Sequence, residues 1–141
     1  MSNNQSVNET SGIRGSDVTT NGIRVQVTTR YLAERSAPRD NEYVFAYFIR
    51  ITNVGTETAQ LLSRHWVITN SDGEVEEVRG DGVVGQQPVL EPGASYDYNS
   101  GCHLKTSVGT MHGEYTMVTA SGETFEARIA PFTLAVPNAL N

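Results

Sequence analysis

Three glycines, Gly80, Gly82 and Gly85, have the G-x-G-x-x-G spacing of loops that bind phosphate groups. In a dinucleotide-binding fold such glycines lie between a strand and a helix, and the helix N-terminus holds the pyrophosphate. Arg79 precedes the loop and would add a positive charge. Pro88 follows too closely for a long helix to begin here, because proline inside a helix costs about 3 kcal/mol. The remaining anion-binding feature would be a cradle of backbone N–H groups.

The same loop also has a structural interpretation, which we favour. It would be a glycine-rich connection between sheets in which Val83 and Val84 fill the core. Residues 74–85 carry four carboxylates against one arginine, which repels an anion. The loop with Arg79 is therefore a candidate site for phosphate, pyrophosphate or nucleotide, and we expect any binding there to be weak.

Cys102 and the histidines His65, His103 and His112 carry the other side chains suited to catalysis or metal binding. Zinc ligands usually come as C-x2–4-C or H-x3–5-H pairs, whereas Cys102 and His103 are adjacent and would point to opposite faces of a strand. Neither Cys102 nor Ser100 lies in a nucleophile motif such as G-x-S-x-G. We predict a packed Cys102, no catalytic residues, no metal and no cofactor.

Arg64 and His65 stand next to Trp66, the single tryptophan. Trp66 is expected to anchor the core, as the buried tryptophan of immunoglobulin-like domains does. Two interpretations of Arg64 and His65 stay open. They would either satisfy neighbouring carbonyls and carboxylates or line an interaction surface.

Strands must position these residues, because no 11-residue window has an apolar stripe of period 3.6. Apolar and polar residues alternate instead, and Asp72-Gly73 and Ser121-Gly122 are hairpin signals. We predict an all-β antiparallel sandwich of seven to eight strands. The strands would cover residues 23–31, 43–51, 60–69, 74–79, 94–99, 115–120, 124–129 and 132–136.

Period two places alternate residues of a strand on opposite faces, but it does not say which face of 43–51 is inward. The predicted neighbours of Trp66 therefore include either Tyr47 or Phe48. The others are Val25, Val27, Phe45, Leu62, Met117 and Phe125.

The 141 residues suit one domain, and 38% hydrophobic residues are enough for a core. Residues 1–17 read as a flexible polar tail, 18–137 as the domain and 138–141 as a short C-terminal tail. Ten Lys and Arg against sixteen Asp and Glu give a net charge of −6, which opposes binding to nucleic acid or anionic membranes. A single cysteine and a polar start without an apolar run favour a cytoplasmic protein.

Several segments together resemble the bacterial ApaG family, also known as CorD, over about residues 22–137. They are Tyr43–Asn53, Leu61–Trp66, Glu77–Pro88, Pro92-Gly93, Tyr98–Gly101, Gly109–Tyr115 and Pro131–Leu134.

The resemblance implies a fibronectin-type-III or immunoglobulin-like sandwich with no known enzymatic activity. It also implies an association with cobalt and magnesium resistance. The family is named after an operon that also encodes a diadenosine-tetraphosphate hydrolase. Related domains occur in an F-box protein and a DNA-polymerase-interacting protein, where a protein-binding role is assumed.

Three functions are therefore in competition. We favour a non-enzymatic module that binds a protein partner of unknown identity. The alternative is binding of phosphate, pyrophosphate or nucleotide through Gly80–Gly85. An enzyme that acts on dinucleoside polyphosphates ranks last, because company in an operon does not establish an activity.

Overall fold

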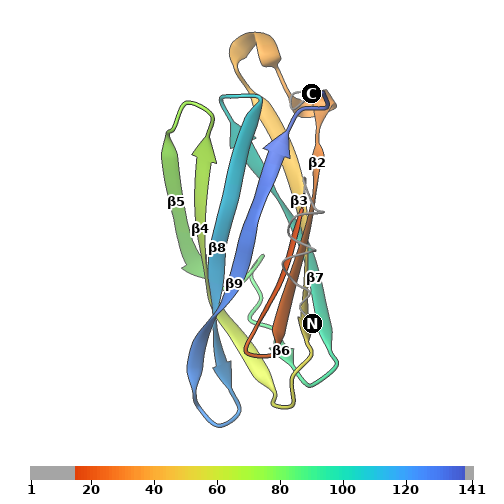
Figure 1. Ribbon diagram of the computed structural model, residues 1–141, viewed down its shortest axis with the longest axis vertical. Helices are drawn as coiled ribbons and strands as arrows, with labels where there is room; N and C mark the ends of the chain where they lie inside the picture. Colours follow the sequence, from red (N-terminus) through yellow and green to blue (C-terminus); the bar gives the residue numbers. More distant parts are fainter. Residues whose placement is uncertain (1–14, 139–141) are drawn as a thin grey trace.

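The computed structural model describes residues 15–138, which form two antiparallel sheets packed face to face (Figure 1). One sheet has the strand order β1-β2-β3-β7 and the other β5-β4-β8-β9, with β6 pairing to β4. The strands are β1 (Ser16–Thr20), β2 (Ile23–Tyr31), β3 (Tyr43–Asn53), β4 (Ala59–Asn70), β5 (Val75–Asp81), β6 (Val89–Leu90), β7 (Ser95–Leu104), β8 (Val108–Thr119) and β9 (Thr124–Ala135). The predicted immunoglobulin-like sandwich is confirmed.

The described residues contain nine strands where seven to eight were expected, because β1 and the two-residue β6 were not predicted. β1 begins at Ser16, two residues before the expected start of the domain. Asp17 of β1 forms an ion pair with Arg24 of β2, with 2.6 Å between Oδ2 and Nη2. The rest of the expected N-terminal tail, residues 1–14, lies outside the described residues, as do residues 139–141. Within 15–138 no helix is long and apolar enough to cross a membrane.

A β-bulge at Pro131 lets β9 run unbroken where two separate strands were predicted. Met111 pairs with Phe132 and Gly113 with Ile129, so β9 holds one more residue than β8 over this stretch. A bulge accommodates proline, which has no N–H for the ladder. The extra residue also reverses the alternation, so Ile129 and Phe132 both face the core.

A second bulge, at Leu62 in β4, has the same effect. Leu61 pairs with Met117 and Ser63 with Thr116, which leaves Leu62 as the extra residue. Leu61 and Trp66 are therefore both buried although they are an odd number of positions, five, apart. Leu62, predicted beside Trp66, is only partly buried, and Leu61 takes its place in the core.

Trp66 is 2% exposed and lies among aromatic rings from both sheets. Its ring centroid is 5.2 Å from that of Tyr47, 5.9 Å from Phe132 and 6.4 Å from Tyr115. Tyr47 faces inward and Phe48 outward, which settles the orientation of β3. The prediction that Trp66 anchors the core is confirmed.

Candidate functional site

The glycine loop folds into a tight turn between β5 and β6. Val83 and Gln86 exchange both backbone hydrogen bonds, at 2.8 and 3.0 Å. Between them Val84 and Gly85 have φ of 49° and 78°, the signs of a type I′ hairpin turn. Val83 is fully buried, but Val84 is 65% exposed, so the expectation that both valines fill the core is wrong for Val84.

The backbone N–H groups of this loop bind carbonyls of the chain itself. The N–H of Gly82 donates to the Leu62 carbonyl at 2.8 Å, and those of Val83 and Gln86 are used within the turn. The short strand β6 follows, so no helix N-terminus faces the loop. Gly82 has φ of 63°, and a Cβ there would lie 2.3 Å from the Gln86 carbonyl oxygen. The glycines therefore serve the turn geometry, and three of the amides that a phosphate would need are occupied.

Arg64 holds the other side of the loop. Its Nη1 donates to the carbonyl oxygens of Asp81 at 3.0 Å and Gly82 at 2.9 Å. Gly80 lies under the guanidinium, and a Cβ at this position would come within 2.8 Å of the Arg64 Cζ. Arg79, in contrast, alternates to the outer face of the sheet, where its side chain is 71% exposed and 3.8 Å from Glu77. The two cations nearest the loop thus lie on opposite faces of the sheet.

His65 forms a bridge between three strands on the outer face of the sheet β5-β4-β8-β9. Its Nδ1 is 2.7 Å from Oε2 of Glu114 in β8, and its Nε2 is 2.8 Å from Oε1 of Glu77 in β5. Ionised carboxylates only accept hydrogen bonds, so both bonds exist together when the imidazole is doubly protonated. The bonds to Glu77 and Glu114 accordingly raise the pKa of His65, and the bond from His65 lowers the pKa of Glu77. Both ring nitrogens are therefore engaged.

Cys102 is 6% exposed and faces the interior from β7. Burial, with a smaller contribution from Glu76, raises the pKa of its thiol to about 12. A nucleophilic cysteine needs a lowered pKa, so this thiol is not activated. His103 and His112 are exposed, and among residues 15–138 no three His, Cys, Asp or Glu side chains form a group able to hold a metal ion.

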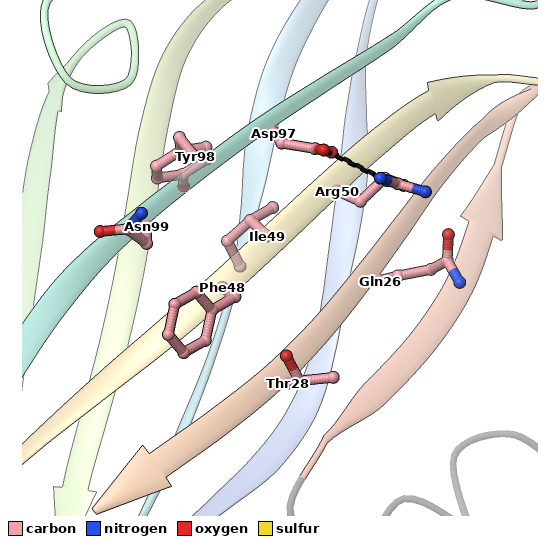
Figure 2. Close-up of a pocket in the computed structure, with 8 residues that line it drawn as sticks. All are labelled: Gln26, Thr28, Phe48, Ile49, Arg50, Asp97, Tyr98 and Asn99. Atoms are coloured by element: carbon pink, nitrogen blue, oxygen red, sulfur yellow. Dashed lines mark hydrogen bonds and ion pairs between the residues drawn. The ribbon is translucent and has the colours of Figure 1, made fainter. Parts of the chain in front are cut away.

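A hollow of about 400 Å³ lies on the outer face of the other sheet, over β2, β3 and β7 (Figure 2). Phe48 lines it, with a side chain that stands outward from β3 and is 38% exposed. Thr28 of β2 and Asn99 of β7 pair with Phe48 in register on its two sides. Gln26 and the ion pair between Arg50 and Asp97, at 2.8 and 2.9 Å, border it.

Comparison with known proteins places the chain in a family. The family model described as the ApaG domain matches residues 33–119. Protein ApaG of Pseudomonas entomophila is 57% identical over 119 residues, which are 84% of this chain and 94% of that protein. Protein ApaG of Azotobacter vinelandii is 58% identical over the same length. The chain belongs to the ApaG family.

A solved structure agrees with this assignment to the ApaG family. The crystal structure of a Bordetella pertussis protein, described as an ApaA protein, is 53% identical and superposes with a TM-score of 0.81. The match covers 83% of this chain and 95% of that one. The segment matched by the ApaG model contains the glycine loop, Arg64, His65 and Phe48, whereas β1 and β9 lie outside it.

The sequence and the structure single out different residues of the ApaG domain. Sequence reasoning found Gly80, Gly82, Gly85, Arg79, Arg64 and His65, of which the structure brings together the loop and Arg64. It missed the hollow around Phe48. The only available signal was the aromatic run at 43–51, and its alternation is compatible with either face being buried.

Proposed function

We propose that this ApaG-family chain is a non-enzymatic module that binds an extended segment of another protein over Phe48. The observation that carries the proposal is an aromatic side chain left 38% exposed in the lining of a 400 Å³ hollow. Aromatic residues and arginine are enriched in protein interfaces and contribute most of the binding energy where they lie in such pockets.

The border of the hollow suits a polypeptide. Gln26 and Asn99 offer amide groups on either side of Phe48, and an amide can both donate to and accept from a peptide backbone. Arg50 and Asp97 already neutralise each other, so the border carries no net charge that would select an ionic ligand. An extended segment with one apolar side chain against Phe48 and its backbone between the two amides would match this pattern.

Other observations are compatible with this proposal. The raised pKa of Cys102 speaks against thiol chemistry, and the occupied amides of the glycine loop speak against phosphate as the main ligand. We place the protein in the cytoplasm as part of the proposal. The family's association with cobalt and magnesium resistance would then depend on the protein that is bound.

The test is a comparison of three forms of the protein with a purified partner. Partners retained from cytoplasmic extract by the wild type are identified, purified and titrated against wild type, Phe48→Ser and Val54→Ser. Val54 is 54% exposed and does not line the hollow, so it is the matched control. We expect Phe48→Ser to weaken binding at least tenfold and Val54→Ser to leave it unchanged. Equal affinity of all three forms would overturn the proposal.

A further inference from the structure

We propose that the glycine loop is a docking knob, in which Val84 inserts into an apolar pocket of a basic partner protein. This goes beyond the proposed function, because the loop and the Phe48 hollow belong to different sheets. Val84 is a β-branched residue in a backbone conformation that such residues disfavour.

Val84 has φ of 49°, in the left-handed region. For an L-residue this conformation brings Cβ too close to the following carbonyl oxygen, and a β-branched residue there is an outlier. Type I′ turns favour Asn-Gly or Gly-Gly at these two positions. The chain has Val84-Gly85 instead, so the first central residue of the turn is one that the turn disfavours.

The side chain gains no burial in exchange for this strain. Val84 is 65% exposed, whereas its neighbour Val83 is fully buried in the core. Positions that break a local rule without a gain inside the fold are typical of functional sites. We therefore assign the missing contact of Val84 to another molecule.

The loop holds Val84 in a fixed position before any partner arrives. The buried side chain of Val83 anchors the loop in the core, and Arg64 donates hydrogen bonds to the loop carbonyls of Asp81 and Gly82. From the other side, Nε2 of Gln87 donates to the Leu62 carbonyl at 2.9 Å, next to the bond from Gly82. A knob that is held in its bound conformation loses little entropy on docking.

The charged residues around the loop indicate which kind of molecule would bind Val84. Asp81 in the loop and Glu76 and Glu77 in the preceding strand are exposed. Arg79 and Arg64 are the two cations nearest the loop, so the surroundings remain acidic by three charges to two. A second copy, which carries the same net charge of −6, and an anionic membrane would both be repelled. A protein with a small apolar pocket rimmed by basic side chains fits both the apolar tip and the acidic surroundings.

The first experiment tests the strain alone. Val84→Asn should raise Tm by about 2–5 °C, because asparagine tolerates the left-handed region. Val84→Thr, which stays β-branched, should leave Tm unchanged, as should Val75→Thr at a position that is 60% exposed in β5. A fall in Tm for Val84→Asn would remove the premise and overturn the proposal.

The second experiment tests the docking. A benzophenone amino acid is placed at position 84, or at 75 as the control, and the protein is irradiated in extract of the source cells. A protein crosslinked from position 84 and not from 75 is identified by mass spectrometry, purified and titrated against the unlabelled variants. We expect Val84→Asn and Val84→Thr to weaken binding about tenfold or more and Val75→Thr to have no effect.

Three results would overturn the docking assignment. They are the absence of an adduct specific to position 84, equal affinities for the Val84 and Val75 variants, and self-association in sedimentation that Val84→Asn abolishes. The Phe48→Ser comparison is independent of all three. Loss of binding in Phe48→Ser with none in the Val84 variants would reject the knob and keep the proposed function, and the reverse result would keep only the knob.

Discussion

The role of each residue in this ApaG-family domain depends on the groups that the fold places next to it. Arg64 and His65 are neighbours in β4, yet Arg64 faces the loop carbonyls and His65 faces two carboxylates on the outer surface. Both satisfy polar groups of the chain, which was one of the two interpretations open from the sequence. Trp66, the next residue, belongs to the core.

Replacement of Trp66 tests the core at the scale of one residue. Trp66→Ala should lower the free energy of unfolding by about 3–5 kcal/mol, since it removes a ring that contacts three others and leaves a cavity. Urea denaturation followed by circular dichroism measures this loss, and Trp66→Phe should lose less. An unchanged midpoint for Trp66→Ala would show that the indole does not support the core.

His65 should make stability depend on pH. Its pKa in the folded state is raised above its usual value of about 6.5, so the stability it contributes is fully present below that value and is lost as pH rises through the raised pKa. The difference in free energy of unfolding between wild type and His65→Gln should therefore shrink from pH 6 to pH 9. Urea titrations across this range measure it, and a difference that does not change with pH would contradict the assignment.

Among the elements, the glycine loop departs most from what its sequence suggests. Its spacing matches a phosphate loop, but the amides close a turn and β6 follows where a helix would be needed. The charge of the adjoining strand is also unfavourable, because repulsion between exposed carboxylates and a phosphate reaches about 8 Å at physiological salt.

The prediction for this element is that phosphate ligands bind weakly at best. Pyrophosphate, ATP and diadenosine tetraphosphate should show Kd values no tighter than about 1 mM, or about −4 kcal/mol, in 0.15 M salt. Amide shifts followed by NMR measure this. Arg79→Gln is the matched variant, because Arg79 is exposed and its replacement leaves the turn intact, whereas Gly82→Ala would clash with Gln86. Micromolar binding that weakens in Arg79→Gln would restore the loop as an anion site.

At the scale of the whole molecule, the net charge of −6 disfavours binding to polyanions such as DNA and anionic membranes. Duplex DNA and phosphatidylserine vesicles should show no binding below about 1 mM at 0.15 M salt, whereas proteins that bind DNA non-specifically reach about 10⁻⁴–10⁻⁶ M. Fluorescence anisotropy and vesicle flotation test the two polyanions. Sub-millimolar binding of either would show that a local basic surface outweighs the overall charge.

Alternation of apolar and polar residues along the chain predicted most of the strands, because period two is a local property of an extended backbone. The hairpin at Asp72-Gly73 was predicted for the same reason, since a turn is specified by its own residues. The bulges at Leu62 and Pro131 were not predicted. A bulge is defined by the register of a partner strand, which the local sequence does not contain.

The features of the candidate site were likewise partly predictable from the sequence and partly set by the fold. An all-β chain of acidic character and a glycine motif without a following helix could be predicted from the residues alone, since composition, periodicity and proline placement are local. Tertiary packing was needed to show that Phe48 faces outward, that Arg64 donates hydrogen bonds to the carbonyls of the loop and that Val84 is exposed at positive φ. Period two divides a strand into two faces, and only the packing of the second sheet determines which of them is buried.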